Sequence, residues 1–151
     1  MEQILVYHLF LKRLNHYQEM IPEINQKSVG SVKPFPVNPR YLVSENGFVF
    51  DTKRSRLSNK SFYKDTEFGS LLPVHFFGKN GEYSGFNMRL PCGKRFFMKL
   101  HRAVAITFIP KSESDGDMVA HIDENQIPRN NCRTNLKWST AAENSMDMIS
   151  N

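Results

Sequence analysis

The segment from residue 120 to residue 144 concentrates side chains that can do acid–base chemistry and can hold one another by hydrogen bonds. It reads AHIDENQIPRNNCRTNLKWSTAAEN, and its one histidine is His121. An imidazole has an ordinary pKa of about 6.5, so His121 can accept a proton from water at neutral pH. The polar residues Asp123, Asn125, Asn131 and Asn135 suit hydrogen bonds that brace a long loop. We therefore take this segment as the candidate site.

A second segment, LHRAVAITFIP at 100–110, precedes the candidate site. Together the two segments resemble the HNH homing endonucleases, a family associated with phages and introns. Its members carry an HR-V-A-F helix, a His-Ile-Asp-x-Asn loop, Asn-Asn, Asn-Leu-x-Trp and a helix that begins near Glu-Asn. The segment YLVSENGFVFD at 41–51 is also similar to a Tyr-x-Val-Ser-x-x-Gly-x-Val module that often precedes such cores. Residues 1–40 match no motif of the family.

The resemblance implies metal-dependent hydrolysis of DNA phosphodiester bonds. His121 would be the general base that activates water. Asn135, the middle residue of the family signature, joins it in the catalytic group, where we expect it to hold the loop against the strand rather than touch substrate. By similarity, Asn144 would offer its side-chain oxygen to a divalent cation, Mg²⁺ or Mn²⁺. One active site per chain predicts nicking, unless a homodimer supplies a second site; monomer and homodimer both stay open.

Ala120 departs from the family pattern, because the residue before the histidine is usually Asp or Asn and supplies an oxygen to the metal. A methyl group cannot coordinate a cation. Three explanations follow: a naturally degenerate enzyme, a deliberately inactivated variant, or a site in which another group replaces the lost ligand. The intact remainder of the motif favours inactivation. Asp147 is three residues beyond Asn144 and could share its helical face, so it is the candidate replacement.

Basic side chains gather beside the 41–51 segment and beside the candidate site. Each run could be a solvated face, but their position beside a phosphate-cleaving motif favours contact with the phosphates of double-stranded DNA. Within the helical segment, His101 could either anchor the helix or contact DNA. Trp138 is expected in the core. The predicted DNA-binding residues are Lys53, Arg54, Arg56, Lys94, Arg95, Lys99, His101, Arg102, Arg129, Arg133 and Lys137.

Spacing of apolar residues predicts the elements that position the site. Residues 2–21 have the period of an amphipathic helix, and the proline-rich stretch up to residue 40 is expected to be an extended linker. A hairpin is predicted at 41–51, where Asn46 and Gly47 suit the positive φ angles of a tight turn. Further strands are expected at 71–77, 83–90 and 95–99, a helix at 100–108, and short strands around MVAHI and LKW. A final helix would be capped by Ser139 or Thr140.

These elements predict an α+β protein, with an N-terminal helix, a small antiparallel β region and a ββα-metal (HNH) finger. The expected regions are residues 1–40 for the helix and linker, 41–99 for a β-rich DNA-contacting part, and 100–151 for the nuclease core. With 151 residues, one compact unit fits the length better than two domains.

Composition agrees with a nucleic-acid partner, since 20 Lys and Arg against 15 Asp and Glu give a formal net charge of +5. Two cysteines without a CxxC pair indicate neither a zinc site nor a disulfide framework. We expect no membrane span and a cytosolic location, in the host cell if the chain is phage-encoded. Two rival functions remain: a catalytically silent DNA-binding module on the same scaffold, and a structural or assembly protein that uses the N-terminal helix.

Overall fold

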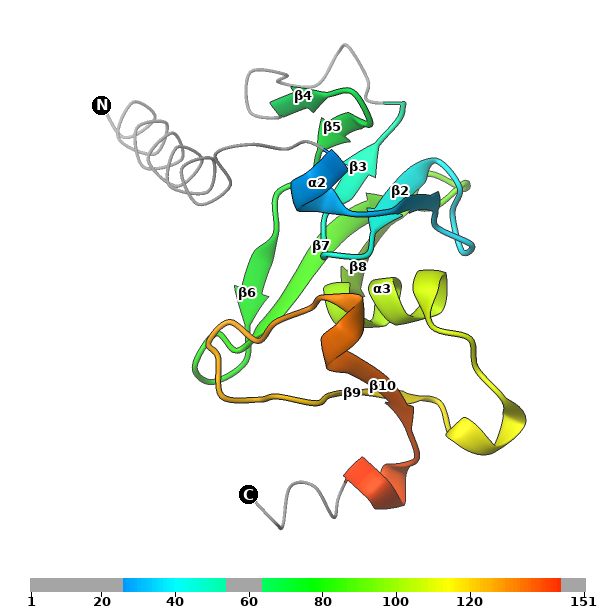
Figure 1. The fold of residues 1–151 in the computed structure, drawn as a ribbon. Coiled ribbons are helices and arrows are strands. Elements are labelled where there is room, and N and C mark those ends of the chain that lie inside the picture. The colour runs from blue at the N-terminus through cyan, green and yellow to red at the C-terminus, as the bar shows by residue number, and fades with distance from the viewer. Residues whose placement is uncertain (1–25, 54–63, 145–151) are drawn as a thin grey trace.

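The computed structural model describes residues 26–53 and 64–144 (Figure 1). Within these ranges the chain is an α+β protein with antiparallel sheets and few helices. The helices are α2 (Gln26–Val29) and α3 (Leu100–Phe108), with 3-10 turns at Glu113–Asp115 and Arg133–Asn135. None of the described helices is long and apolar enough to cross a membrane. The expected helix at 2–21 lies outside the described residues.

A five-stranded antiparallel sheet is formed by the first part of the described chain. Its strands are β1 (Val32–Pro34), β2 (Tyr41–Ser44), β3 (Val49–Asp51), β4 (Lys64–Thr66) and β5 (Gly69–Leu71), in the order β1-β2-β3-β5-β4. The β2–β3 hairpin confirms the prediction at 41–51. Gly47 has the predicted positive φ, with a value of 89°. The prediction is wrong for Asn46, because only glycines have a positive φ among the described residues.

The expected linker before residue 41 is packed where the structure describes it. Strand β1 pairs with β2, placing Val32 opposite Ser44. Val29 and Phe35 are both fully buried, and Phe35 belongs to the main hydrophobic cluster. The extended-linker interpretation is therefore wrong for these residues. Prolines end a helical pattern in the sequence, but they do not prevent the apolar residues between them, such as Val29 and Phe35, from packing in a hydrophobic core.

A three-stranded antiparallel sheet follows, in the order β6-β7-β8, with β6 (His75–Phe77), β7 (Tyr83–Arg89) and β8 (Arg95–Lys99). Strands β7 and β8 confirm two of the predicted strands. The single strand expected at 71–77 is instead divided, because β5 ends at Leu71 and β6 begins at His75 in the other sheet. Pro73 lies between them and cannot donate a ladder hydrogen bond.

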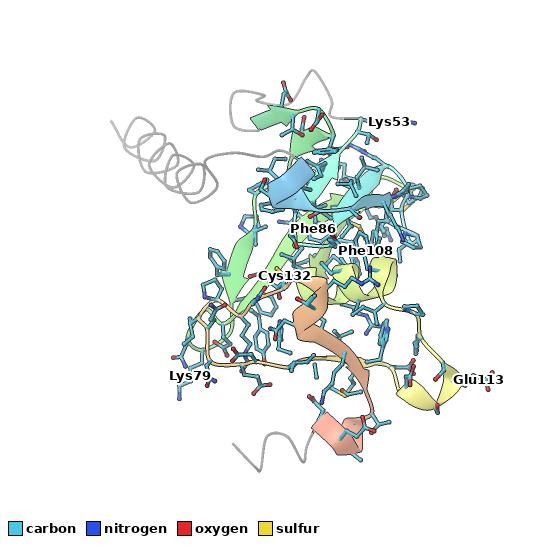
Figure 2. All side chains as sticks on the ribbon, viewed as in Figure 1. Lys53, Lys79, Phe86, Phe108, Glu113 and Cys132 are labelled. Atoms are coloured by element: carbon cyan, nitrogen blue, oxygen red, sulfur yellow. The ribbon has the colours of Figure 1, made fainter. Side chains whose placement is uncertain are left out.

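Helix α3 packs against the sheets and closes the core (Figure 1). Its buried face contains Leu100, Val104 and Phe108, the three residues whose spacing predicted the helix. The helix ends at Phe108, two residues before Pro110. Phe86 of β7 lies on the other side of this cluster, so the β-rich region and the region after residue 100 share one core (Figure 2).

Strands β9 (Met118–His121) and β10 (Leu136–Ser139) form a separate antiparallel pair, also in contact with α3. Residues 141–144 are helical, and Thr140 caps them: the Glu143 N–H donates to Thr140 Oγ1 and the Thr140 N–H donates to Glu143. Trp138 is half-buried rather than a core residue. Its Nε1 donates to the Ile109 carbonyl, and the Arg102 guanidinium lies 5.9 Å from its ring.

Core burial at Phe86 predicts a large stability effect. Phe86→Ala should lower the free energy of unfolding by about 3–5 kcal/mol, because it removes a fully buried ring and leaves a cavity. The matched control is Phe76→Ala in neighbouring strand β6, where half of the side chain is exposed (50%) and the loss should be much smaller. Urea unfolding followed by circular dichroism measures both. Equal losses would contradict the described core.

Candidate functional site

His121 ends strand β9 and faces Leu136 of β10 across the ladder. Its side chain is buried, and its Nε2 atom lies 2.8 Å from the side-chain oxygen of Asn131. An amide oxygen only accepts hydrogen bonds, so the tautomer that makes this contact a hydrogen bond carries its proton on Nε2 and its lone pair on Nδ1. Asn131 was expected only to brace the loop. The sequence spacing could not show that Asn131 contacts His121, because side chains in irregular loops have no fixed period.

Asn135 holds the loop between β9 and β10. Its side-chain oxygen accepts from the Asp123 N–H at 2.8 Å, and its Nδ2 donates to the carbonyls of Asp123 and Asn130. Its own carbonyl accepts from the Ile122 N–H directly after the histidine. These are hydrogen bonds of the loop-bracing kind expected of Asn135, and the side chain is buried with its polar atoms used in this way. Asn135 is thus a positioning residue for the backbone around His121.

A cluster of aromatic and basic side chains surrounds the histidine. The His101 ring, on the first turn of α3, lies 4.8 Å from the His121 ring. The ring of Tyr83 in β7 lies 6.1 Å from that of His101 and 6.4 Å from that of His121. Arg129 covers Tyr83, with its guanidinium 4.8 Å from the ring centre and its Nη1 donating to the hydroxyl. Side chains from β7, α3 and β9, which are far apart in the sequence, therefore meet at the site.

Both histidines are held neutral at pH 7. Burial, followed by the charges of His121 and Lys99, lowers the pKa of His101 to about 3. Burial also lowers the pKa of His121, while the Asn131 contact opposes this and the charge of Arg129 adds to it. Of the two roles expected for His101, structural anchoring fits its burial, since only 8% of the residue is exposed. His121 is in the base form that proton acceptance requires.

The side chains near His121 that the structure describes do not provide enough ligands for a complete cation site. Ala120 is buried, lies opposite Lys137 in the ladder and offers only a methyl group. Asn144 is half-buried on the first helical turn after Thr140. Within residues 26–53 and 64–144, no group of three or more His, Cys, Asp or Glu side chains could hold a metal ion. Asp147, the candidate replacement ligand, lies outside the described residues.

Some of the predicted DNA-binding side chains make contacts within the protein, and Arg133 does so while it is also exposed. Arg102 donates to the Asp117 carbonyl, and Arg133 lies 3.9 Å from the Glu45 carboxylate. Arg129 is half-buried, and its buried Nε has no hydrogen-bond partner among the described residues. Arg54 and Arg56 lie outside those residues. The exposed members are Lys53, Lys94, Arg95, Lys99, Arg133 and Lys137.

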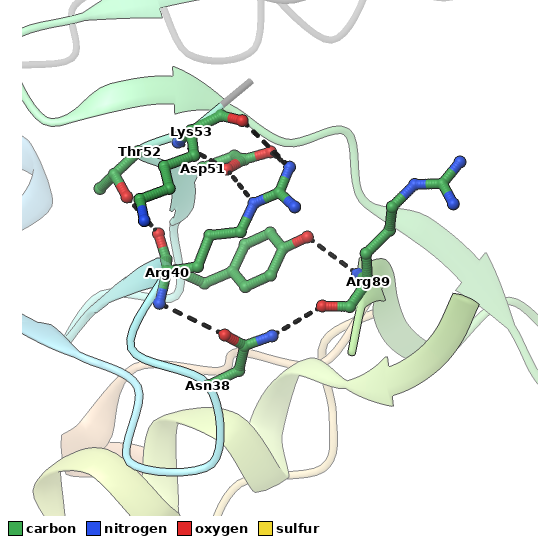
Figure 3. A network of polar contacts seen from close by, with 7 residues as sticks. Asn38, Arg40, Asp51, Thr52, Lys53 and Arg89 are labelled. Atoms are coloured by element: carbon green, nitrogen blue, oxygen red, sulfur yellow. Dashed lines mark hydrogen bonds and ion pairs between the residues drawn. The ribbon is translucent and has the colours of Figure 1, made fainter. Parts of the chain in front are cut away.

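A basic pocket that the sequence did not predict lies beside Lys53 (Figure 3). It has a volume of about 530 Å³, and Arg40 and Arg89 also line it. The Arg40 guanidinium donates two hydrogen bonds of 2.9 Å to the Asp51 carboxylate, and the Asn38 amide donates to the Arg89 carbonyl. The Asp51 contact raises the pKa of Arg40, so this side chain is fixed in its charged form.

Comparisons with protein-family models, with curated proteins and with solved structures found no match to this chain. The resemblance to the HNH family therefore depends on the motifs of the sequence, and the function must be argued from those motifs together with the geometry of the site.

Because His101 is buried in its neutral form, we expect the free energy of unfolding to depend on pH. Its folded pKa of about 3 lies below the ordinary 6.5, so its contribution is fully present above pH 6.5 and is lost as the pH falls toward 3. At pH 5 the loss from this residue should be about 2 kcal/mol relative to pH 7. His101→Leu should reduce this pH dependence of the unfolding free energy.

The control for this measurement is His75→Leu, because His75 is exposed on strand β6. Urea unfolding at pH 5 and pH 7 gives the difference for each variant. If the two variants change the pH dependence equally, the burial of a neutral His101 is not its source.

Proposed function

We propose that the chain is an HNH-type protein that acts on DNA phosphodiester bonds, with an intact general base and an incomplete cation site. The observation that carries the proposal is the 2.8 Å contact between His121 Nε2 and the Asn131 side-chain oxygen. It leaves Nδ1 as the proton acceptor on a histidine that burial holds neutral. The β9–β10 pair followed by the helical residues 141–144 supports reading this part as the ββα finger of the HNH resemblance.

The chain's own residues suggest how the reaction would begin. Water bound beside His121 would give a proton to Nδ1 as its oxygen attacks phosphorus, while the bond from phosphorus to the 3′ oxygen breaks and that oxygen takes a proton from solvent. The resulting imidazolium keeps its Nε2–H bond to Asn131, whose oxygen stabilises the positive charge. Arg129 already acts on the pKa of both histidines, so its charge reaches the region where the anionic phosphate would lie. Asn135 keeps the loop fixed during this step.

The DNA-binding part of the proposal is supported by charge. Exposed Lys94, Arg95 and Lys99 lie in or beside β8, which leads directly into α3 and His101. Contacts from such side chains to phosphates release counterions, so affinity for duplex DNA should fall steeply as salt concentration rises. In the family this reaction uses Mg²⁺ or Mn²⁺ to stabilise charge on the phosphate, and Ala120 removes the ligand expected for it.

A second candidate function is a catalytically silent DNA-binding module. The specific observation in its favour is the buried methyl group of Ala120 next to an otherwise complete base arrangement. Both candidates predict DNA binding, and they differ only in whether the chain can cleave. A structural or assembly role would instead predict no DNA affinity at moderate salt.

Metal-dependent cleavage by the starting chain would favour the nuclease over the silent module, and Ala120→Asp tests the assignment of position 120. The starting chain should cleave plasmid DNA slowly or not at all, whereas the variant should cleave it with Mg²⁺ or Mn²⁺ and stop when a chelator is added. A non-catalytic measurement accompanies this assay: a buried carboxylate is costly unless it is paired, so Ala120→Asp should lower the melting temperature and Mg²⁺ should partly restore it. Absence of metal-dependent cleavage and of metal stabilisation would contradict the assignment of position 120.

The base assignment is tested in that same background. His121→Ala should lower the cleavage rate by roughly 10²- to 10⁴-fold, because the proton acceptor is lost, while affinity for duplex DNA stays nearly unchanged. The control is His75→Ala, which removes an exposed histidine of β6 and should leave the rate unaltered. Equal rates with and without His121 would mean that another group activates the water.

A further inference from the structure

The β6-β7-β8 sheet has one face in the core and one face that carries aromatic and basic side chains. Alternation along the strands places Phe86, Met88 and Met98 on the core face, where all three are buried. The other face we call the outer face. Its members used here are Phe77, Tyr83, Arg89, Arg95, Phe97 and Lys99.

The aromatic side chains of the outer face form a row that leads to the candidate site. Phe97 meets Phe77 edge to face, with ring centres 5.4 Å apart, and Phe77 stacks on Tyr83 at 5.5 Å. Tyr83 continues the row to His121. Phe97 is nevertheless 42% exposed, so much of its surface faces solvent.

Gly85 is the residue that lets the Phe97 ring lie across the sheet. A Cβ atom at Gly85 would lie 2.2 Å from Cζ of Phe97, closer than any real contact, although the glycine does not have a positive φ. A side chain at Gly85 would therefore displace the Phe97 ring, and its Cβ would also lie 2.9 Å from the Met98 carbonyl oxygen.

The charges of the outer face have one sign. The three strands contain Arg89, Arg95 and Lys99 and no Asp or Glu. Arg89 and Arg95 are directly opposite each other in the β7–β8 ladder, and like charges in such a pair are destabilising. A phosphate placed near both would remove that repulsion. The charge pattern thus complements a polyanion and disfavours an apolar protein partner.

We propose that the outer face binds an unpaired stretch of single-stranded DNA and directs it toward His121. A base stacks on Phe97, and the backbone phosphates lie against Arg89, Arg95 and Lys99. Duplex DNA would leave the aromatic row unused, because its bases already stack on one another and only an unpaired base offers a free face. This inference rests on the proposed function in that DNA is the ligand, but it does not require cleavage.

The chain offers a matched pair of variants for the test. Phe96 and Phe97 are neighbours in β8 with similar exposed fractions, 46% and 42%, on opposite faces of the sheet. Phe97→Leu keeps an apolar side chain over Gly85 but removes the stacking surface, whereas Phe96→Leu makes the same change away from the outer face. Phe97→Tyr restores an aromatic ring, which a purely structural role would not specifically require.

Binding of the full chain to a fluorescent single-stranded oligonucleotide, and to the same sequence as a duplex, is measured by anisotropy. Phe97→Leu should weaken single-strand binding by roughly 5- to 100-fold, the scale of one lost base stack, while Phe96→Leu and Phe97→Tyr change it less than twofold. Arg95→Gln should lower the slope of log affinity against log salt concentration by about 0.7.

Two failures are distinguishable. If the duplex binds and the single strand does not, or if Phe96→Leu and Phe97→Leu have equal effects, the outer face is not a single-strand site, and the proposed action on DNA still stands. If neither oligonucleotide binds at moderate salt, both this inference and the proposed function are wrong.

Discussion

The burial of one face of α3 is the constraint on which the site depends. Val104 and its neighbours on that face pack against strands of the β-rich region, while β9 and β10 contact the same helix. Because the helix begins directly after β8, this packing fixes its first turn, and His101 with it, beside the end of β9.

Burial also sets the chemistry of His121. Removing an imidazole from water favours its neutral form, which is the form that accepts a proton. The hydrogen bond to the Asn131 oxygen limits this lowering of the pKa and favours the tautomer with its proton on Nε2. His101 is buried next to His121, and its pKa is lowered to about 3, so at pH 7 it adds no positive charge beside His121. The loop bonds of Asn135 hold these groups in one arrangement.

Periodic features were predictable from the sequence, and contacts between distant elements were not. The spacing of Leu100, Val104 and Phe108 predicted α3 correctly, and Gly47 marked the β2–β3 turn. The placement of Tyr83 beside His121 depends on how the β6-β7-β8 sheet meets α3 and β9, which no local pattern specifies. The packed residue Phe35 was missed for a related reason: the prolines around it indicated an irregular backbone, and its burial depends on a core formed later in the chain.

The proposed base chemistry depends on Asn131 holding His121 neutral with its proton on Nε2. Two-dimensional ¹H–¹⁵N NMR of the histidine side chains across pH 5–8 reports both the tautomer and the pKa. We expect His121 to be the Nε2–H tautomer at pH 7 with a pKa below 6.5, and Asn131→Ala to mix the two tautomers. A His121 that is protonated at pH 7, or that carries its proton on Nδ1 in the unchanged chain, would contradict it.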